Sequence, residues 1–350
     1  MPLRDEYKLR SSDLRKILGV APATLNEIFR KQDVDDKLAK NGATKSISNA
    51  DVRKIFESRG FSFPKKAEVI SFICCKGGTA KTSSCYQTSV RLSQCGSRVL
   101  SWDGDSQGNL STCYHKPFQD FEFAESTPVF LDVITGEQEF EDVLIEVTEN
   151  LTLLPSTPAN STLDSAIERK FKNQSIAFAK YINRVRDQFD YILIDCAPVL
   201  NTTNLGIIAA SDKIVIPLNS DDFSALALRQ TLEEIKNIRD EFKLGPVDVK
   251  ILLTRIDGRE HVANGRFIAA ISETLDKEAE DRLGKKYLRC EIANTVIASS
   301  TDIKKTIASG DDLFATRSRA KDDYDQFARD LVGLTDFEKG RRGRKGAAKK

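Results

Sequence analysis

The sequence lacks the features that would place the protein in a membrane or outside the cell. No apolar run approaches the roughly 18 to 20 residues needed to span a bilayer. The first ten residues, MPLRDEYKLR, have no apolar centre of the kind found in signal peptides. The seven cysteines are odd in number and show no paired C-x-x-C spacing, which argues against a disulfide framework and against a zinc site. We therefore expect a cytoplasmic protein with reduced, mostly buried thiols.

Net charge is also nearly absent, but the value of +1 hides an uneven distribution. Residues 1–66 carry 15 Lys/Arg against 9 Asp/Glu, and the last ten residues, RRGRKGAAKK, carry six basic residues and no acid. The segment 67–340 compensates with 43 acidic against 32 basic residues. Basic ends on an acidic body indicate contact with a polyanion through the ends, although a solvated basic tail is the simpler alternative for the last residues.

The chain divides at SFPKKAE, where Pro64 and two lysines separate a basic, helical leader from a strand-like run. We expect three parts: a small helical domain over 1–66, a larger strand-containing domain over 67–338 and a basic tail over 339–350.

Short aliphatic runs alternate with amphipathic stretches from residue 69 onward. Such runs are typical of strands buried on both faces, and their alternation with helices predicts an α/β fold with a doubly wound, mostly parallel sheet. Ligands of such sheets bind at the carboxyl ends of the strands. The predicted strands are VISFICC (69–75), VLSWDGD (99–105), LTLLPST (151–157), YILIDCA (191–197), KIVIPLN (213–219) and VKILLTRID (249–257).

The segment CKGGTAKTSS follows the first predicted strand and opens a helix, which is the position of a phosphate loop. Lys81 would bridge the β- and γ-phosphates, and the Thr82 hydroxyl would ligate magnesium. The strict pattern G-x-x-x-x-G-K-[ST] fails here, because Cys75 and Ala80 stand at its glycine positions. A strand–turn–helix with a surface lysine is the alternative interpretation.

The segment closely resembles the deviant phosphate loop K-G-G-x-x-K-[ST] of the ParA/MinD family of dimeric ATPases. In that family the first lysine reaches the nucleotide of the partner subunit, which implies that Lys81 serves its own ATP and Lys76 the ATP across a homodimer. The resemblance covers about residues 68–332 and implies the cofactors ATP and Mg²⁺. The implied nucleotide-binding residues in the loop are Lys76, Gly77, Gly78, Thr79, Ala80, Lys81, Thr82 and Ser83.

Carboxylates follow two further predicted strands. LSWDGDSQGNLS resembles the D-x-D-P-Q-G-N segment of the family, with Ser106 in place of proline, and implies Asp105 as the hydrolytic residue and Asp103 beside the magnesium shell. FDYILIDCAPVLN ends a strand in Asp195, a carboxylate suited to holding magnesium through water. The alternative for Asp103 and Asp105 is a pair that caps the next helix.

Two weaker matches complete the predicted site. DCAP resembles the second switch of the family, which places Pro198 near the γ-phosphate. ILLTRIDGR resembles the strand that ends beside the adenine base, which implies Thr254 and Arg255 as adenine contacts.

The leader SSDLRKILGVAPATLNEIFRK has apolar residues at the inward positions of a helix-turn-helix, with Gly19 in the turn and Pro22 opening the second helix. The second helix would present Thr24, Asn26 and Arg30 to a DNA major groove. A further helix, SNADVRKIFESRG, is followed by a wing-like FSFP, as in the longer ParA proteins that often repress their own operon. A helical leader that packs the dimer is the structural alternative.

The leading functional hypothesis is a plasmid or chromosome partition ATPase that binds nucleoid DNA and is stimulated by a ParB-like or small centromere-binding protein. Positioning of another cargo and an ATP-switched regulator remain alternatives. A MinD-type membrane partner is not expected, because FEKGRRGRKGAAKK lacks bulky apolar residues. An iron–sulfur role through Cys113 and Cys196 is also not expected. The residues predicted to contact non-specific DNA are Lys304, Lys305, Arg317, Arg319 and Lys321, together with Arg259 and Arg266. A solvated charged face is the alternative for each of them.

Overall fold

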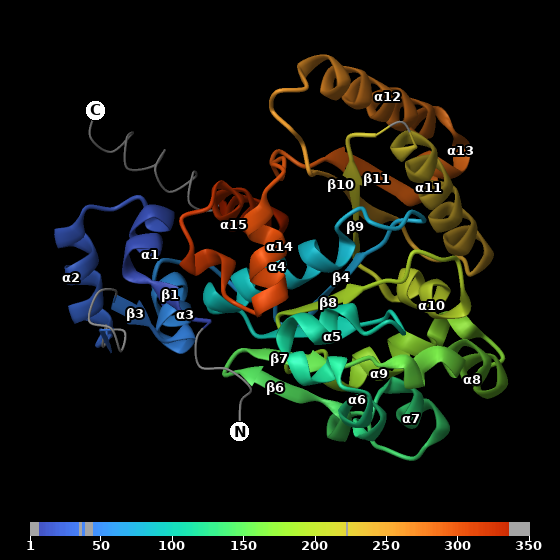
Figure 1. The fold of residues 1–350 in the computed structure, drawn as a ribbon, viewed down its shortest axis with the longest axis horizontal. Helices are drawn as coiled ribbons and strands as arrows, with labels where there is room; N and C mark the ends of the chain where they lie inside the picture. Colours follow the sequence, from blue (N-terminus) through green and yellow to red (C-terminus); the bar gives the residue numbers. More distant parts are fainter. Residues whose placement is uncertain (1–6, 35–36, 39–44, 222, 336–350) are drawn as a thin grey trace.

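The computed structural model describes residues 7–34, 37–38, 45–221 and 223–335. An eight-stranded sheet with helices on both faces forms most of the molecule (Figure 1). A smaller N-terminal module, built from the described residues between 7 and 58, packs against one end of it. The predicted tail 339–350 lies outside the described residues.

The large sheet has the strand order β11-β10-β9-β4-β8-β5-β7-β6. Every neighbouring pair is parallel except β6 with β7. All six predicted strands are present, and the edge strands β6 and β11 were not predicted. The strands span β4 Glu68–Phe72, β5 Val99–Asp103, β6 Ile145–Thr148, β7 Leu151–Leu154, β8 Tyr191–Asp195, β9 Lys213–Asn219, β10 Val247–Thr254 and β11 Leu288–Ile292.

The central strands are apolar throughout because helices cover both faces of the sheet. Alternate side chains of one strand point to opposite faces: in β4, Val69 belongs to one buried cluster, whereas Ile70 and Phe72 belong to the other. The predicted doubly wound α/β arrangement is therefore confirmed for this part of the chain.

Two sets of helices supply these clusters. The first face is covered by α7 Phe130–Thr135, α8 Leu163–Lys170, α9 Ala177–Val185, α10 Thr202–Ala210, α11 Ser224–Glu241, α12 His261–Glu280 and α13 Arg282–Tyr287. The second is covered by α4 Lys81–Gln94, α5 Asn109–Tyr114, α14 Thr301–Ser309 and α15 Arg319–Leu331. The remaining short elements are α6 Phe121–Ser126 and the 3₁₀ turns η1 Lys116–Gln119, η2 Glu141–Val143, η3 Pro158–Thr162, η4 Gln174–Ile176 and η5 Leu313–Ala315.

The N-terminal module contains two helices at the predicted places. The first helix ends at Gly19, whose φ of 60° is left-handed, and Pro22 is the first residue of the second. The prediction of a wing at FSFP is wrong, because residues 61–64 form no strand. Instead, two antiparallel strands lie between the second and third helices. The elements are β1 Leu9–Arg10, α1 Ser11–Leu18, α2 Pro22–Gln32, β2 Lys37–Leu38, β3 Lys45–Ile47 and α3 Asn49–Ser58.

The module is joined to the large sheet by buried contacts. Its apolar cluster includes Cys95, which follows α4, and Leu334 near the end of the described chain. The hydroxyl oxygens of Tyr7 and Tyr86 lie 2.6 Å apart. These contacts link the module to α4, the helix that starts at the predicted phosphate loop.

Two further expectations concern cysteines and membranes. The seven cysteines, all within the described residues, are free, and five of them are buried. Among the described residues, no helix combines the length and apolarity that a bilayer crossing requires.

Candidate phosphate-loop site

The loop between β4 and α4 has the backbone of a phosphate loop despite its missing glycines. Gly78 and Ala80 both adopt left-handed conformations, with φ of 74° and 71°. For an alanine this conformation costs roughly 1 to 2 kcal/mol, so the position where the strict motif has glycine still imposes a glycine-like geometry. The space beside Gly77 and Gly78 is open, since a Cβ added to either residue would meet no heavy atom within 4 Å. This leaves the loop amides accessible to an anion.

The two lysines of the loop differ in position. Lys81 is 7% exposed, and its Nζ donates to the carbonyl oxygen of Lys76 at 3.0 Å, across the loop. The Lys76 side chain is 25% exposed and forms an ion pair with Asp221, which lies between β9 and α11. Its Nζ also lies 6.0 Å from the centre of the Phe223 ring. The structure thus separates a buried lysine that contacts the loop from a more exposed lysine paired with Asp221, and the roles predicted for them stay predictions.

Neighbouring strands hold the loop from behind. Asn219 at the end of β9 donates from Nδ2 to the carbonyl of Gly78 at 3.0 Å. The buried Thr254 hydroxyl at the end of β10 lies 2.8 Å from Asn219 Oδ1 and 3.1 Å from the carbonyl of Thr79. These contacts give Thr254 a loop-supporting role that the sequence did not predict; its adenine role remains a prediction.

Further loop contacts were also missed from sequence. The amide of Cys75 donates to the Thr231 hydroxyl of α11 at 3.1 Å, and Asp221 receives Lys76. The one available signal was the position of Asn219 at the end of a predicted strand and of Asp221 just after it, where ligand-binding residues of parallel sheets gather.

The three predicted carboxylates meet at adjacent strand ends. Asp103 and Asp195 are register partners in the parallel pair β5–β8, and Phe72 is the partner of Asp195 on the β4 side. The amide of Gly104 donates to the carbonyl of Asp195 at 2.8 Å, and a Cβ at this position would lie 2.8 Å from that oxygen. Asp105 follows directly, 8% exposed.

Asp103 is held by a set of donors from its own loop and from α5. It accepts from the amide of Asp105 at 3.2 Å and from the amide and hydroxyl of Ser111, both at 2.8 Å. Burial raises the pKa of Asp103 to about 7, although these hydrogen bonds oppose the shift. The helix-capping alternative for Asp103 is therefore also realised in part, since it receives the Ser111 amide in α5.

Asp195 is the least satisfied of the carboxylates. Burial, followed by the charge of Asp103, raises its pKa well above the ordinary range, while the Thr82 side chain and Lys81 act in the opposite direction. Neither Asp195 carboxylate oxygen has a well-formed hydrogen bond among the described residues. A buried carboxylate whose oxygens lack a well-formed hydrogen bond fits a cation at this place.

The residues present fit magnesium held largely by water and phosphate. Among the described residues, no group of three or more His, Cys, Asp and Glu side chains is arranged to hold a metal. Mg²⁺ commonly uses one or two protein ligands and completes its shell with water and phosphate oxygens. Thr82 in the first turn of α4 and the unsatisfied Asp195 supply that limited set, with Ser83 next in the same turn.

Pro198 and Arg255 lie at the rim of the site. Pro198 lines an open pocket of about 700 Å³, together with Cys75, Val199, Leu200 and the polar residues Arg229, Gln230, Glu233 and Glu234. Arg255 follows β10 with a left-handed φ of 55° and is exposed. No contact among the described residues tests the adenine role predicted for Arg255.

The residues predicted to contact DNA fall on two surfaces. Thr24, Asn26 and Arg30 are exposed on α2 of the N-terminal module. Lys304 and Lys305 are exposed on α14, and Arg317 and Arg319 are exposed between α14 and the start of α15.

Lys321 requires a correction. Its side chain is only 12% exposed, and its Nζ donates to Asp13 of the N-terminal module at 3.0 Å. This lysine stabilises the joint between α1 and α15, so it does not belong to an open DNA-binding surface.

Fold and loop geometry together define a P-loop protein, and comparison with known proteins places it more closely. Residues 67–245 match the family model AAA_31, described as an AAA domain. The sporulation initiation inhibitor protein Soj of Bacillus subtilis is 26% identical over 272 residues, covering 76% of this chain and 98% of Soj. The chromosome partitioning protein ParA of Caulobacter vibrioides is 27% identical over 229 residues, covering 64% and 79%. The chain belongs to the ParA/MinD family of deviant Walker A ATPases.

Solved structures show the same fold. An ATP complex of an McdA variant from Cyanothece superposes with a TM-score of 0.64 at 20% identity, covering 77% of this chain and 97% of that one. A putative plasmid partition protein of Borrelia burgdorferi bound to AMPPNP gives 0.58 at 17% identity, covering 76% and 99%.

Proposed function

We propose that the protein is a DNA partition ATPase that uses ATP and Mg²⁺. The observation that carries the proposal is the division of the two loop lysines: Lys81 turns inward to the loop, and Lys76 points outward to an ion pair at the surface. A second ammonium on the same triphosphate would be largely redundant, whereas an outward lysine is placed to act on another subunit.

The loop amides and Lys81 would bind the phosphates, and Thr82 and Asp195 would hold the metal. Mg²⁺ supplies a Lewis acid that neutralises charge on the phosphates. Asp105 would orient the attacking water, because its carboxylate leaves the end of β5 beside the loop and has no basic partner among the described residues. Asp103 would help to position Asp105, because its carboxylate accepts a hydrogen bond from the Asp105 amide.

The active form would be a homodimer with the two sites facing each other. Apolar side chains gather around the loop in support of this: Val199 and Leu200 are each 51% exposed, Phe223 is 70% exposed and Leu226 is 52% exposed. Exposed apolar residues at a rim favour burial against a partner surface. Formation of the dimer would require Lys76 to leave Asp221.

DNA would bind through the exposed basic residues of α14 and α15, with sequence-specific operator binding and repression through α2. The first part would provide nucleoid association without sequence preference. Replacing Lys304 and Lys305 together by glutamine should reduce the slope of log affinity against log salt by about two, since each phosphate contact releases close to one counterion. Exchange of the paired Lys277 on α12 by glutamine is the control and should leave the slope unchanged.

The names of the relatives favour partition over other cargo. Soj of Treponema pallidum, 25% identical over 268 residues, is named a chromosome-partitioning ATPase. The cell division protein PomZ of Myxococcus xanthus is 29% identical over 175 residues, so positioning of a different cargo is the second candidate. We propose the domain limits 1–66 and 67–338 with a basic tail over 339–350, with Leu334 of the second part completing the core of the first.

The decisive experiment measures ATP turnover with DNA and the protein encoded by the neighbouring gene. We expect weak turnover alone and strong stimulation by a ParB-like or small centromere-binding partner. Asp105→Ala should abolish the stimulated turnover while ATP binding is retained. If Asp105→Ala abolishes segregation but leaves operon repression intact, the segregation and regulatory functions are separable. An ATP turnover rate that neither DNA nor the partner protein increases would contradict the partition function.

A further inference from the structure

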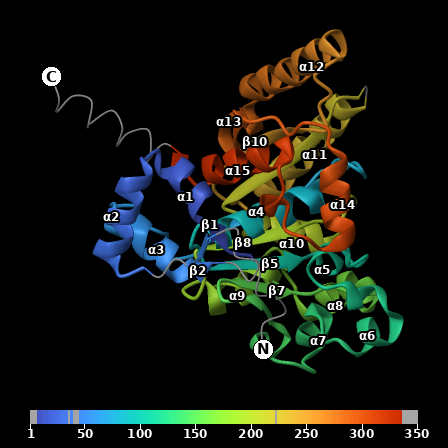
Figure 2. The same cartoon turned by 60° about the vertical axis from the view of Figure 1, so that its left-hand side comes forward.

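A long segment outside the nucleotide site carries acidic residues and no basic ones. Residues 117–168 contain no Lys, Arg or His among 52 residues, and we call this segment the acidic lobe. It runs from η1 through α6, α7, β6 and β7 to α8. In both views α6 and α7 lie away from the N-terminal module, whereas β6 and β7 lie nearer to it (Figures 1 and 2). Its twelve acidic residues are Asp120, Glu122, Glu125, Asp132, Glu137, Glu139, Glu141, Asp142, Glu146, Glu149, Asp164 and Glu168.

Most of this charge is exposed and not neutralised from within the chain. All but Asp132 and Asp164 are exposed. Arg184 of α9 pairs with Glu139 and Glu141. Lys170 reaches the lobe too, but it donates to the carbonyls of Val133 and Ile134 rather than to a carboxylate. Within the described part of the chain, five exposed carboxylates of the lobe have neither an ion pair nor a hydrogen-bond donor: Glu122, Glu125, Asp142, Glu146 and Glu149.

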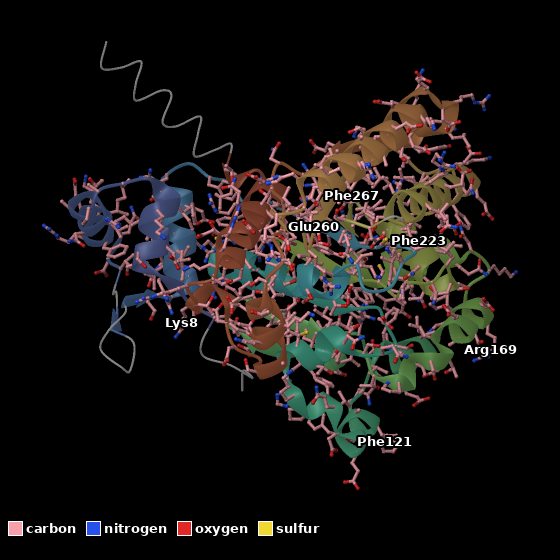
Figure 3. The ribbon with its side chains drawn as sticks, turned by 45° about the horizontal axis from the view of Figure 1, so that its top comes forward. Lys8, Phe121, Arg169, Phe223, Glu260 and Phe267 are labelled. Carbon is pink, nitrogen blue, oxygen red and sulfur yellow. The ribbon has the colours of Figure 1, made fainter. Side chains whose placement is uncertain are left out.

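An exposed aromatic group stands among these carboxylates. Phe121 is 72% exposed on α6, and Figure 3 shows it at the outer edge of the molecule. Phe123, 36% exposed, makes an edge-to-face contact with Phe118 and a tilted contact with His115, at ring-centre distances of 5.3 and 5.4 Å. Covering this exposed phenylalanine with another surface removes apolar area from water, which lowers the free energy of the system.

We propose that the acidic lobe is a docking surface for a positively charged segment of a partner protein that carries an apolar or aromatic side chain. Its Lys and Arg side chains would pair with Glu122 and Glu125, and its apolar side chain would cover Phe121. A guanidinium can also lie on the face of the Phe121 ring. The same charge pattern repels nucleic acid, so this face and the basic α14–α15 surface bind opposite kinds of partner.

Two other occupants fit less well. A second copy of the same face would bring like charges together in a two-fold contact. The basic tail of this chain follows Leu334, which packs in the N-terminal module, and that module lies away from α6 in both views (Figures 1 and 2).

The test uses the full chain and does not depend on ATP turnover. The probe is a fluorescein-labelled peptide of about 14 residues with a net charge of about +6 and one tryptophan, titrated by fluorescence anisotropy without nucleotide. Glu122→Lys with Glu125→Lys should weaken binding about tenfold or more, because the reversal turns attraction into repulsion. Asp276→Lys with Glu280→Lys on the exposed side of α12 changes the net charge equally and should change affinity less than twofold.

The aromatic contribution is tested separately. Phe121→Ser should weaken binding of the tryptophan peptide about threefold or more, but should leave binding of a matched peptide with serine in place of tryptophan unchanged. Phe121 is exposed, so the substitution should not disturb folding, and circular dichroism checks this. In cells, a photo-crosslinking phenylalanine analogue at position 121 should capture a protein whose basic segment, made as a peptide, shows the same sensitivity to the glutamate reversals.

Three results would overturn the proposal. Equal losses from the α12 control would mean that net charge alone attracts the peptide. Stronger peptide binding after removal of residues 339–350 would identify the chain's own tail as the occupant. Crosslinks at position 121 between two copies of this chain would identify a self-contact. Because binding is measured without ATP, none of these results bears on the partition ATPase.

Discussion

In the proposed dimer, the ion pair between Lys76 and Asp221 would make association depend on a residue outside the phosphate loop. The two side chains are 25% and 37% exposed, so the pair contributes about 0.5 to 1 kcal/mol after solvent screening. If Lys76 must leave Asp221 in each subunit to reach the partner's ATP, a dimer loses two such pairs. Asp221→Asn removes this cost and should strengthen dimerisation by about 1 to 2 kcal/mol, or roughly 5- to 30-fold.

The substitution is well suited to isolate charge. Asp221 also accepts from the amide of Phe223 at 3.1 Å and from the Ser224 hydroxyl at 3.0 Å, and an asparagine oxygen can keep both bonds. Hydrogen bonds from Lys76 and then Ser224 hold the pKa of Asp221 below its usual value in spite of partial burial, so the Asp221 carboxylate is ionised near neutral pH.

Sedimentation velocity with ATP and Mg²⁺ is the assay, in an Asp105→Ala background that prevents turnover. Asp221→Glu keeps the charge and serves as the control. The gain from Asp221→Asn should shrink at high salt, where the wild-type pair is itself weakened. Lys76→Ala should remove the dimer with or without Asp221→Asn. An Asp221→Asn protein that dimerises no better than the parent would refute the reasoning.

Three further substitutions, with Gly136→Ala as a control, test the surroundings of α4. Ala80→Gly should raise the free energy of unfolding by about 1 kcal/mol in urea, because glycine accepts the left-handed φ of 71°. Gly96→Ala should destabilise by about 3 kcal/mol, since its Cβ would lie 2.6 Å from the Arg53 amide nitrogen, whereas Gly136→Ala, with a similar φ and open space, should cost only about 1 to 2 kcal/mol. Burial raises the pKa of Asp312 to about 6 from 3.8, so the folded protein holds this proton where the unfolded chain loses it. The free energy of unfolding should therefore decrease as the pH is raised from about 4 to 6, by at most about 3 kcal/mol. Asp312→Asn should remove this decrease when thermal unfolding is measured across that pH range.

Much of the fold was predictable because the central strands are apolar on both faces. β8 reads YILID, with every residue buried, so the run itself indicates a strand. The edge strands carry a weaker signal: β11 reads LRCEI and exposes Arg289 and Glu291, and β6 exposes Glu146. An edge strand is covered less completely, so its sequence is less apolar and resembles a loop.

The candidate site was predictable where it is local in sequence. The spacing of Lys76, Gly78 and Lys81 sets the loop by itself. Asp221 could not be assigned in this way, because its contact with Lys76 spans 145 residues and depends on β4 and β9 being neighbours. The misplaced Lys321 has the same origin, since its partner Asp13 is 308 residues away.

The helix α4 also sets a limit on how the chain can be divided. It begins at the inward lysine of the phosphate loop and leads directly into Cys95, inside the core of the N-terminal module. A chain shortened to start at residue 67 would lose the covering of Cys95 and Leu334 and leave Asp190 without its Arg53 guanidinium. The N-terminal module therefore covers apolar residues at the C-terminal end of this helix. Its removal should make the remaining protein aggregate more readily, with a smaller effect on nucleotide binding.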